Sequence, residues 1–217
     1  MTQITVLGGT GYAGAAIVAE AVRRGHEVTA VARHRPTGAA AIAGASYLEG
    51  SVTEPAFLDA AIGKTDVVIS ALSPRGPMLG QVRRVNRELI RMADMLWQFR
   101  LGVILGAGSL TAVPGGPPLA AGPDFPAAFK PEADEMAGVL QDLKSSPAGV
   151  DWFGVSPAPA FGAFAPGEAK GFYRTGGDVV LVDDSGFSYI SAPDLALAVL
   201  DEIDRPAHKR QRFTVAY

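Results

Sequence analysis

The sequence predicts a doubly wound α/β fold, in which one parallel sheet is covered by helices on both faces. Short apolar runs alternate with helical patterns through the first two thirds of the 217 residues. Several of these runs are apolar on both faces, which is typical of strands buried inside a parallel sheet. Right-handed crossovers between such strands place helices on both sides, so the alternation predicts this architecture.

Six strands and four helices are expected in alternation along this part of the chain. The expected strands are Ile4–Leu7, Glu27–Ala32, Ser46–Leu48, Asp66–Ser70, Leu101–Leu105 and Val150–Val155. The expected helices are Tyr12–Arg24, Glu54–Ile62, Gly80–Phe99 and Lys130–Ser145. The longest helix places Val82, Val85, Leu89, Met92 and Leu96 three or four residues apart, a spacing typical of one buried stripe.

The pattern changes after Ser156. Residues 173–182 predict two short extended segments around a Gly-Gly turn. Pro193 then opens a last helix, and Arg212–Ala216 is expected to form a closing strand. We expect residues 1–217 to form a single domain, with residues 157–217 contributing a small C-terminal extension.

Composition excludes several kinds of protein. The absence of cysteine rules out disulfides and thiolate metal sites, and His26, His34 and His208 lie far apart, so no metal site is predicted. The net charge of -3 and the lack of a basic cluster argue against a nucleic-acid partner. No signal segment and no apolar stretch of about 18 residues is recognised, so we expect a cytoplasmic protein without a membrane partner. No pattern specifies an oligomeric state.

The loop after the first strand is rich in glycine, and residues 4–14 read ITVLGGTGYAG. Gly8 allows a sharp turn, Gly11 allows close approach to a pyrophosphate, and Gly14 allows close packing of the helix that follows. The amides and positive dipole end of that helix favour phosphate, so Thr10 and Tyr12 are expected to contact it too. A purely structural turn is the alternative, but the flanking strand and helix predict an NAD(P)-binding Rossmann fold.

The second strand ends in the sequence ValAlaArgHisArg at residues 31–35. An enzyme that uses NAD usually carries an acid here, whereas the guanidinium of Arg33 suits a 2′-phosphate. No carboxylate stands beside Arg33 in this stretch. The prediction is that NADP(H) is preferred and NAD(H) is possible; an exposed strand end without a ligand is the alternative.

The carboxyl ends of the other strands should complete the site, because ligands of an open parallel sheet bind along that edge. Ser109 follows the fifth strand and is the candidate catalytic hydroxyl, with a turn residue as the alternative. Further candidate cofactor-binding residues at these ends are Ser51, Val52, Ala71, Leu72, Gly108 and Pro157.

Two long, proline-rich segments follow the fifth and sixth strands, Thr111–Pro131 and Pro157–Arg174. Loops of this length are usually functional or disordered, so we expect them to roof a substrate pocket, which makes 157–217 a substrate-side extension. The aromatic residues expected in that roof are Phe125, Phe129, Phe161, Phe164 and Tyr173. Simple anchoring of the loops by these rings is the alternative.

The glycine loop followed by Arg33 resembles the atypical short-chain dehydrogenase/reductase group of NAD(P)H-binding proteins. That group includes biliverdin-IX-beta reductase/flavin reductase and the NmrA-like proteins. The stretches at 105–110, 124–132, 152–158, 173–178 and 212–217 are similar to its bacterial branch described as NADH-flavin reductases.

Most of that superfamily uses a Tyr-x-x-x-Lys pair to transfer a proton, and no tyrosine here has a lysine four residues later. The resemblance therefore implies an NAD(P)H-dependent reductase of a flavin, quinone or similar planar acceptor, which needs no such pair, with Ser109 matching the serine after the fifth strand. The alternative is an NADP(H)-binding redox-sensing regulator like the NmrA-like proteins. An epimerase or dehydratase of sugar nucleotides is disfavoured by the short chain.

Overall fold

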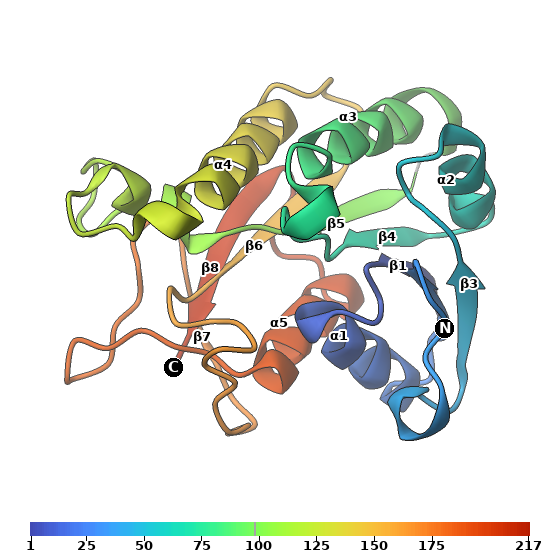
Figure 1. Ribbon diagram of the computed structural model, residues 1–217, viewed down its shortest axis with the longest axis horizontal. Coiled ribbons are helices and arrows are strands. Elements are labelled where there is room, and N and C mark those ends of the chain that lie inside the picture. The colour runs from blue at the N-terminus through green and yellow to red at the C-terminus, as the bar shows by residue number, and fades with distance from the viewer. Residues whose placement is uncertain (98) are drawn as a thin grey trace.

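The computed structural model describes residues 1–97 and 99–217, leaving out the side chains of residues 96 and 97. Its centre is one eight-stranded sheet in the order β3-β2-β1-β4-β5-β6-β8-β7 (Figure 1). The strands are β1 Gln3–Leu7, β2 Glu27–Ala32, β3 Ala45–Glu49, β4 Val67–Ser70, β5 Arg100–Ile104, β6 Trp152–Pro157, β7 Arg174–Gly176 and β8 Gln211–Ala216. The helices are α1 Tyr12–Arg23, α2 Pro55–Ile62, α3 Val82–Met92, α4 Lys130–Lys144 and α5 Ala192–Asp204.

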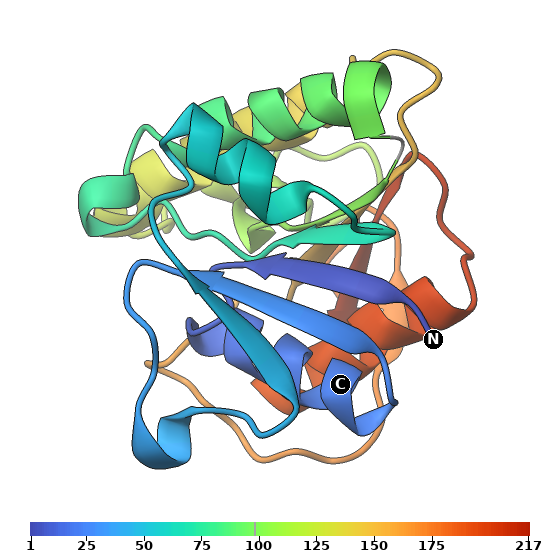
Figure 2. The ribbon, with the colours of Figure 1, turned by 90° about the vertical axis from the view of Figure 1, so that its right-hand side faces the viewer.

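Helices cover both faces of the sheet, as the alternating pattern predicts. Helices α1 and α5 lie on one face, and α2, α3 and α4 lie on the other (Figures 1 and 2). Each face has its own apolar core. Ile17 of α1 and Leu195 of α5 belong to the first core, and Leu89 of α3 and Leu140 of α4 belong to the second. The doubly wound α/β fold is confirmed, and residues 157–217 supply α5, β7 and β8 to it.

The parallel pairing brings the strand ends to one edge of the sheet. Leu7 at the end of β1 pairs with Val31 of β2 on one side and with Ser70 of β4 on the other. Strand order reverses between β1 and β4, because β2 and β3 extend to one side of β1 and β4 to the other. Crevices at such reversals are the usual ligand sites of open α/β sheets.

The helix expected over residues 80–99 is shorter in the structure. Helix α3 ends at Met92, and a π-helical turn follows over Ala93–Trp97. This wider turn shifts the phase of the helix by about one residue, and the adjacent Met92 and Ala93 are both buried. The expected place of Leu96 in the apolar stripe lies outside the described side chains.

The segment 173–182 does not form a pair of extended segments around its Gly-Gly turn. Strand β7 instead pairs antiparallel with β8, with Gly176 opposite Thr214. Farther on, Val179 makes only an isolated bridge to Thr111. Strand β8 has a free edge and is longer than the five residues that follow the Gly-Gly turn. Strand β7 therefore pairs with β8, and no hairpin forms within residues 173–182.

A buried carboxylate links helix α5 to the start of β5 and to the loop before β8. Glu202 of α5 is 4% exposed and accepts hydrogen bonds from Arg100 Nη2 at 2.5 Å and from the backbone amide of His208 at 2.9 Å. Burial alone would raise the pKa of Glu202, but the bonds from Arg100 and His208 outweigh it and hold the pKa below its ordinary value. His208 is therefore engaged in a structural contact.

Candidate functional site

A cleft of about 1120 Å³ runs along the carboxyl edge of the sheet. It is larger than the roughly 300–1,000 Å³ of common small-molecule sites. One half is lined by the glycine loop and by the ends of β2, β3 and β4. The other half is lined by residues drawn from 104–136 and 157–164, and we call it the aromatic half. The volume and the two walls suit a dinucleotide with a second ligand beside it.

The glycines of the loop are required by close backbone approaches. Gly8 has φ +77°, and a Cβ there would lie 2.8 Å from the carbonyl oxygen of Ala71. A Cβ on Gly14 would lie 2.1 Å from the carbonyl oxygen of Gly8, and a Cβ on Gly11 would lie 3.2 Å from the same atom. Gly14 does not line the cleft, because it holds the first turn of α1 against the loop. Larger side chains would push the loop out of this shape.

The same loop leaves backbone amides available to an anion. Two of its amides are already engaged, because those of Gly8 and Gly9 both donate to the carbonyl of Val31 at 3.0 Å. Within the described residues, the amides of Tyr12 and Ala13 at the start of α1 have no acceptor. The first turn of α1 also carries no acidic residue that would neutralise the helix dipole. This cradle fits the pyrophosphate of a dinucleotide.

Arg33 lines the cleft at the end of β2 and is exposed. Contrary to the expectation from the local sequence, a carboxylate lies close to this basic segment. Glu49 at the end of β3 accepts a hydrogen bond from the amide of Arg35 at 3.3 Å, and its carboxylate lies 3.8 Å from His34 Nδ1. Strand pairing brings it there from 14 residues away. Arg33 itself makes no hydrogen bond or ion pair with the described residues, so its guanidinium is available to a ligand.

The remaining candidate cofactor-binding residues come together as expected from the sheet topology. The residues of this group that line the cleft are Thr10, Tyr12, Ser51, Val52, Ala71, Leu72, Gly108 and Pro157. They lie at or just after the ends of five different strands, so only the parallel sheet makes them neighbours.

Ser109 is not placed as expected. It does not line the cleft, although Gly106, Ala107 and Gly108 just before it do. Its hydroxyl accepts a hydrogen bond from Arg212 Nη1 at 3.0 Å. The side chain of Arg212 is 2% exposed and also donates to Asp178 and Ser156, so Ser109, which is half-buried, is one of several acceptors that satisfy it. The geometry gives Ser109 a role in holding the end of β5 and does not support contact with a substrate.

Four of the five expected aromatic residues line the cleft: Phe125, Phe129, Phe161 and Phe164. Tyr173 does not, because its hydroxyl donates to Asp201 of α5 at 2.6 Å. Burial and the neighbouring carboxylate raise the pKa of Tyr173. Its role is to anchor the end of the segment 157–174.

The two long segments meet over the cleft. The rings of Phe129 and Phe164 stack with their centroids 6.1 Å apart, one ring from each segment. Phe161 packs edge-on against Tyr12 of the glycine loop at 5.1 Å, and the Tyr12 hydroxyl donates to the carbonyl of Pro166 at 2.9 Å. Burial raises the pKa of Tyr12. Tyr12 therefore connects the loop to the aromatic half.

Few polar side chains line the aromatic half. Within the described part of the chain, the lining residues from 104–136 and 157–164 include two polar side chains, Asp124 and Glu132. Glu132 pairs with Arg75, which reaches over from the end of β4, at 2.8 Å. No local sequence pattern singles out these three residues, since only the fold brings Arg75 next to α4.

The described residues contain no group of three or more His, Asp or Glu side chains that could hold a metal ion. No helix among them has the length and apolar character needed to cross a membrane.

The fold and the cleft define a dinucleotide-binding protein of the Rossmann type. The comparison with known families agrees, because residues 8–206 match the family described as NAD(P)H-binding. The chain belongs to this family. A nicotinamide dinucleotide is therefore its cofactor, and its general class is that of the NAD(P)H-dependent oxidoreductases.

Relatives of known sequence or structure cover nearly the whole chain. The uncharacterised protein YwnB of Bacillus subtilis is 36% identical over 217 residues, which cover 98% of this chain and 97% of YwnB. A protein of Streptococcus pneumoniae, proposed to be an NADH-flavin reductase, has a crystal structure with a TM-score of 0.81 and 32% identity, covering 100% of this chain and 99% of that one.

Two further crystal structures carry other descriptions. One, from Burkholderia pseudomallei, is of a protein proposed to be exported, with a TM-score of 0.85 and 35% identity over 100% of both chains. Another, from Bacteroides thetaiotaomicron, is of a protein proposed to be an epimerase, with a TM-score of 0.87 and 30% identity over 100% of this chain and 98% of that one.

Proposed function

We propose that the protein is an NAD(P)H-dependent reductase that passes a hydride to a flavin, a quinone or a similar planar conjugated acceptor. The observation that carries this proposal is the composition of the aromatic half. Its described lining offers flat apolar surfaces and no tyrosine, lysine, histidine or serine side chain. Such a wall suits a ring system, and its two carboxylates, Asp124 and Glu132, do not supply the tyrosine–lysine pair that usually transfers the proton in alcohol chemistry.

The shape of the aromatic half supports a planar acceptor. Phe129 and Phe164 are 39% and 60% exposed, although large apolar side chains are usually buried. Both rings line the cleft at the point where the two long segments meet. Aromatic faces stack well on conjugated rings, and a stacked ring would cover them from water.

The absence of a proton-donating pair is compatible with this reaction. When bound, the cofactor supplies the hydride through its nicotinamide ring. A conjugated acceptor spreads the resulting charge over its rings, so water reaching the open cleft can deliver the proton. The residues of this chain then contribute mainly by positioning the two reactants. The amides of Tyr12 and Ala13 hold the pyrophosphate, and the small residues Gly106, Ala107 and Gly108 leave room for the reacting rings.

We further propose that NADP(H) is preferred and that NAD(H) is accepted more weakly. The support is Arg33, an exposed cation on the cleft wall without a partner among the described residues. A guanidinium binds a 2′-phosphate by charge-assisted hydrogen bonds that a ribose hydroxyl cannot match. Glu49 lies near His34 and Arg35, so it offsets part of the positive charge of the segment.

We further propose a small-molecule partner and a cytoplasmic location, without a nucleic-acid or membrane partner. The cleft suits a small molecule, the absence of cysteine suits a reducing compartment, and the net charge of -3 provides no basic footprint for nucleic acid.

The decisive experiment follows NADPH oxidation by absorbance under single-turnover conditions with FMN, FAD, quinones and biliverdin in turn. The proposal expects oxidation with at least one of these acceptors and faster oxidation of NADPH than of NADH. Tight NADPH binding without oxidation by any acceptor would contradict it.

The second candidate is a redox-sensing regulator that binds NADP(H) with little or no turnover. The same missing proton donors favour it, because a sensor needs the cofactor site alone. It predicts NADPH binding, no turnover with any acceptor, and a change in protein shape or assembly between the NADPH-bound and NADP⁺-bound forms. Small-angle scattering of the two forms measures that change.

A further inference from the structure

We propose that the aromatic half of the cleft selects uncharged planar acceptors over acceptors that carry a phosphate group. This inference rests on the proposed function and narrows its substrate class. Riboflavin and quinones belong to the favoured group, and FMN belongs to the disfavoured group.

The aromatic half provides no unpaired cation. Its polar side chains among the described residues are the carboxylates of Asp124 and Glu132. The cation beside it, Arg75, has its Nε 2.8 Å from Glu132 Oε2, and its guanidinium lies 5.9 Å from the centre of the Phe129 ring. Glu132 thus neutralises Arg75 at the place where a phosphate would need it.

Asp124 makes the local balance negative. Its carboxylate is exposed on the cleft wall beside Phe125, and it makes no hydrogen bond or ion pair with any described residue. One cation and two carboxylates leave this region with one net negative charge. A phosphate monoester carries a charge of about -1.5 to -2 at neutral pH, so it is repelled here.

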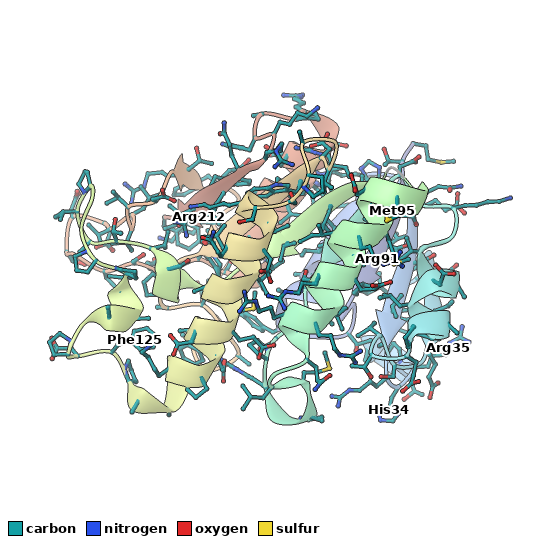
Figure 3. All side chains as sticks on the ribbon, turned by 90° about the horizontal axis from the view of Figure 1, so that it is seen from above. His34, Arg35, Arg91, Met95, Phe125 and Arg212 are labelled. Atoms are coloured by element: carbon teal, nitrogen blue, oxygen red, sulfur yellow. The ribbon has the colours of Figure 1, made fainter. Side chains whose placement is uncertain are left out.

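The other cation of the cleft lies at the opposite end and has a different role. Arg33 stands directly before His34 and Arg35, and Figure 3 shows those two residues far from Phe125 along the same side of the molecule. With the cofactor in place, Arg33 is occupied by the ribose end of the dinucleotide. Among the described residues that line the cleft, a phosphate on the acceptor therefore finds no unpaired cation.

Riboflavin and FMN test this inference directly, because they share one isoalloxazine ring and differ only in the phosphate. The experiment titrates each flavin into protein saturated with NADP⁺ and measures binding by quenching of flavin fluorescence. We expect riboflavin to bind roughly five times more tightly than FMN, and we expect added salt to reduce the difference by screening. Equal binding, or tighter binding of FMN, would overturn the proposal.

Three variants assign the effect to the named charges. Glu132→Gln releases Arg75, and Asp124→Asn removes the unpaired carboxylate, so each should lower the ratio of riboflavin affinity to FMN affinity about threefold. Asp184→Asn is the matched control, because Asp184 is exposed and lies outside the cleft. A shift in FMN binding as large in the control as in the cleft variants would contradict the assignment.

The flavin titration and the NADPH-oxidation experiment can fail independently of each other. Failure of every acceptor to oxidise NADPH would refute the reductase while the two flavin affinities still decide the charge argument. Failure of both flavins to bind would overturn the charge selection for flavins even if a quinone is reduced.

Discussion

Replacement of Arg33 by alanine is the sharpest test of the cofactor assignment. The guanidinium is exposed on the cleft wall and has no hydrogen bond or ion pair within the described residues. Its removal therefore breaks no internal contact, and the unfolding free energy should change by less than about 0.5 kcal/mol. Any larger effect on cofactor affinity then reports on the lost contact with the ligand.

The size of the effect follows from the chemistry of the contact. A hydrogen bond to a charged group contributes about 1.5–3 kcal/mol. We expect a contribution at the lower end of this range for two reasons. Arg33 is exposed to water, and the carboxylate of Glu49 lies close to Arg35. About 1.5 kcal/mol corresponds to a roughly tenfold weaker binding of NADPH. Binding of NADH should change less than about twofold, because its ribose hydroxyl gains little from a cation.

Isothermal titration calorimetry of NADPH and NADH, with the wild-type protein and the variant, measures both affinities. Arg35→Ala is the matched control, because Arg35 is a neighbouring exposed arginine that does not line the cleft. The reasoning is refuted if Arg33→Ala leaves the ratio of the two affinities unchanged. An equal loss of NADPH affinity in both variants would also count against it, since it would point to the general charge of the segment.

Three further predictions follow from the structure. Gly14→Ala places a Cβ 2.1 Å from the carbonyl oxygen of Gly8, so NADPH binding should weaken by at least tenfold in calorimetry; unchanged affinity would show that the loop does not need this packing. Tyr12→Phe removes the hydrogen bond to Pro166 but keeps the ring, which should lower the unfolding free energy by about 1 kcal/mol in urea titrations, and an unaltered midpoint would contradict the contact. Glu202 has a lowered pKa when folded, so its contribution to stability is present above its ordinary pKa of 4.5 and is lost as the pH falls through the folded value. Between the ordinary pKa of 4.5 and the lower folded value, Glu202→Gln should therefore flatten the decline of the unfolding free energy with falling pH, and an identical slope in both proteins would refute the linkage.

The sequence predicted most of the fold because its parallel strands are short apolar runs with helices between them. Such strands are recognisable locally, since both of their faces are buried. Where contacts with distant segments of the chain decide the structure, local sequence patterns did not predict it. Strand β7 pairs with β8 rather than within its own segment, and α3 gives way to a π-helical turn at Ala93–Trp97.

The candidate site likewise contains residues whose roles follow from local sequence and residues whose placement depends on the fold. The glycine spacing is a local backbone requirement, so Gly8, Gly11 and Gly14 were predictable from the sequence. The orientation of Ser109 was not, because it depends on Arg212, which lies 103 residues away in the chain. Figure 3 shows Arg212 set back from the side of the molecule that carries Phe125.

The sequence alone thus determined the class of fold and the shape of the glycine loop, because strand burial, helix starts and glycine turns are encoded by neighbouring residues. Tertiary structure alone decided the character of the aromatic half. It stacked Phe129 on Phe164 and paired Arg75 with Glu132, residues that the chain separates by 35 and 57 positions respectively. Charge and shape at a ligand site are sums over residues from several strands and loops, and those residues become neighbours only when the sheet forms.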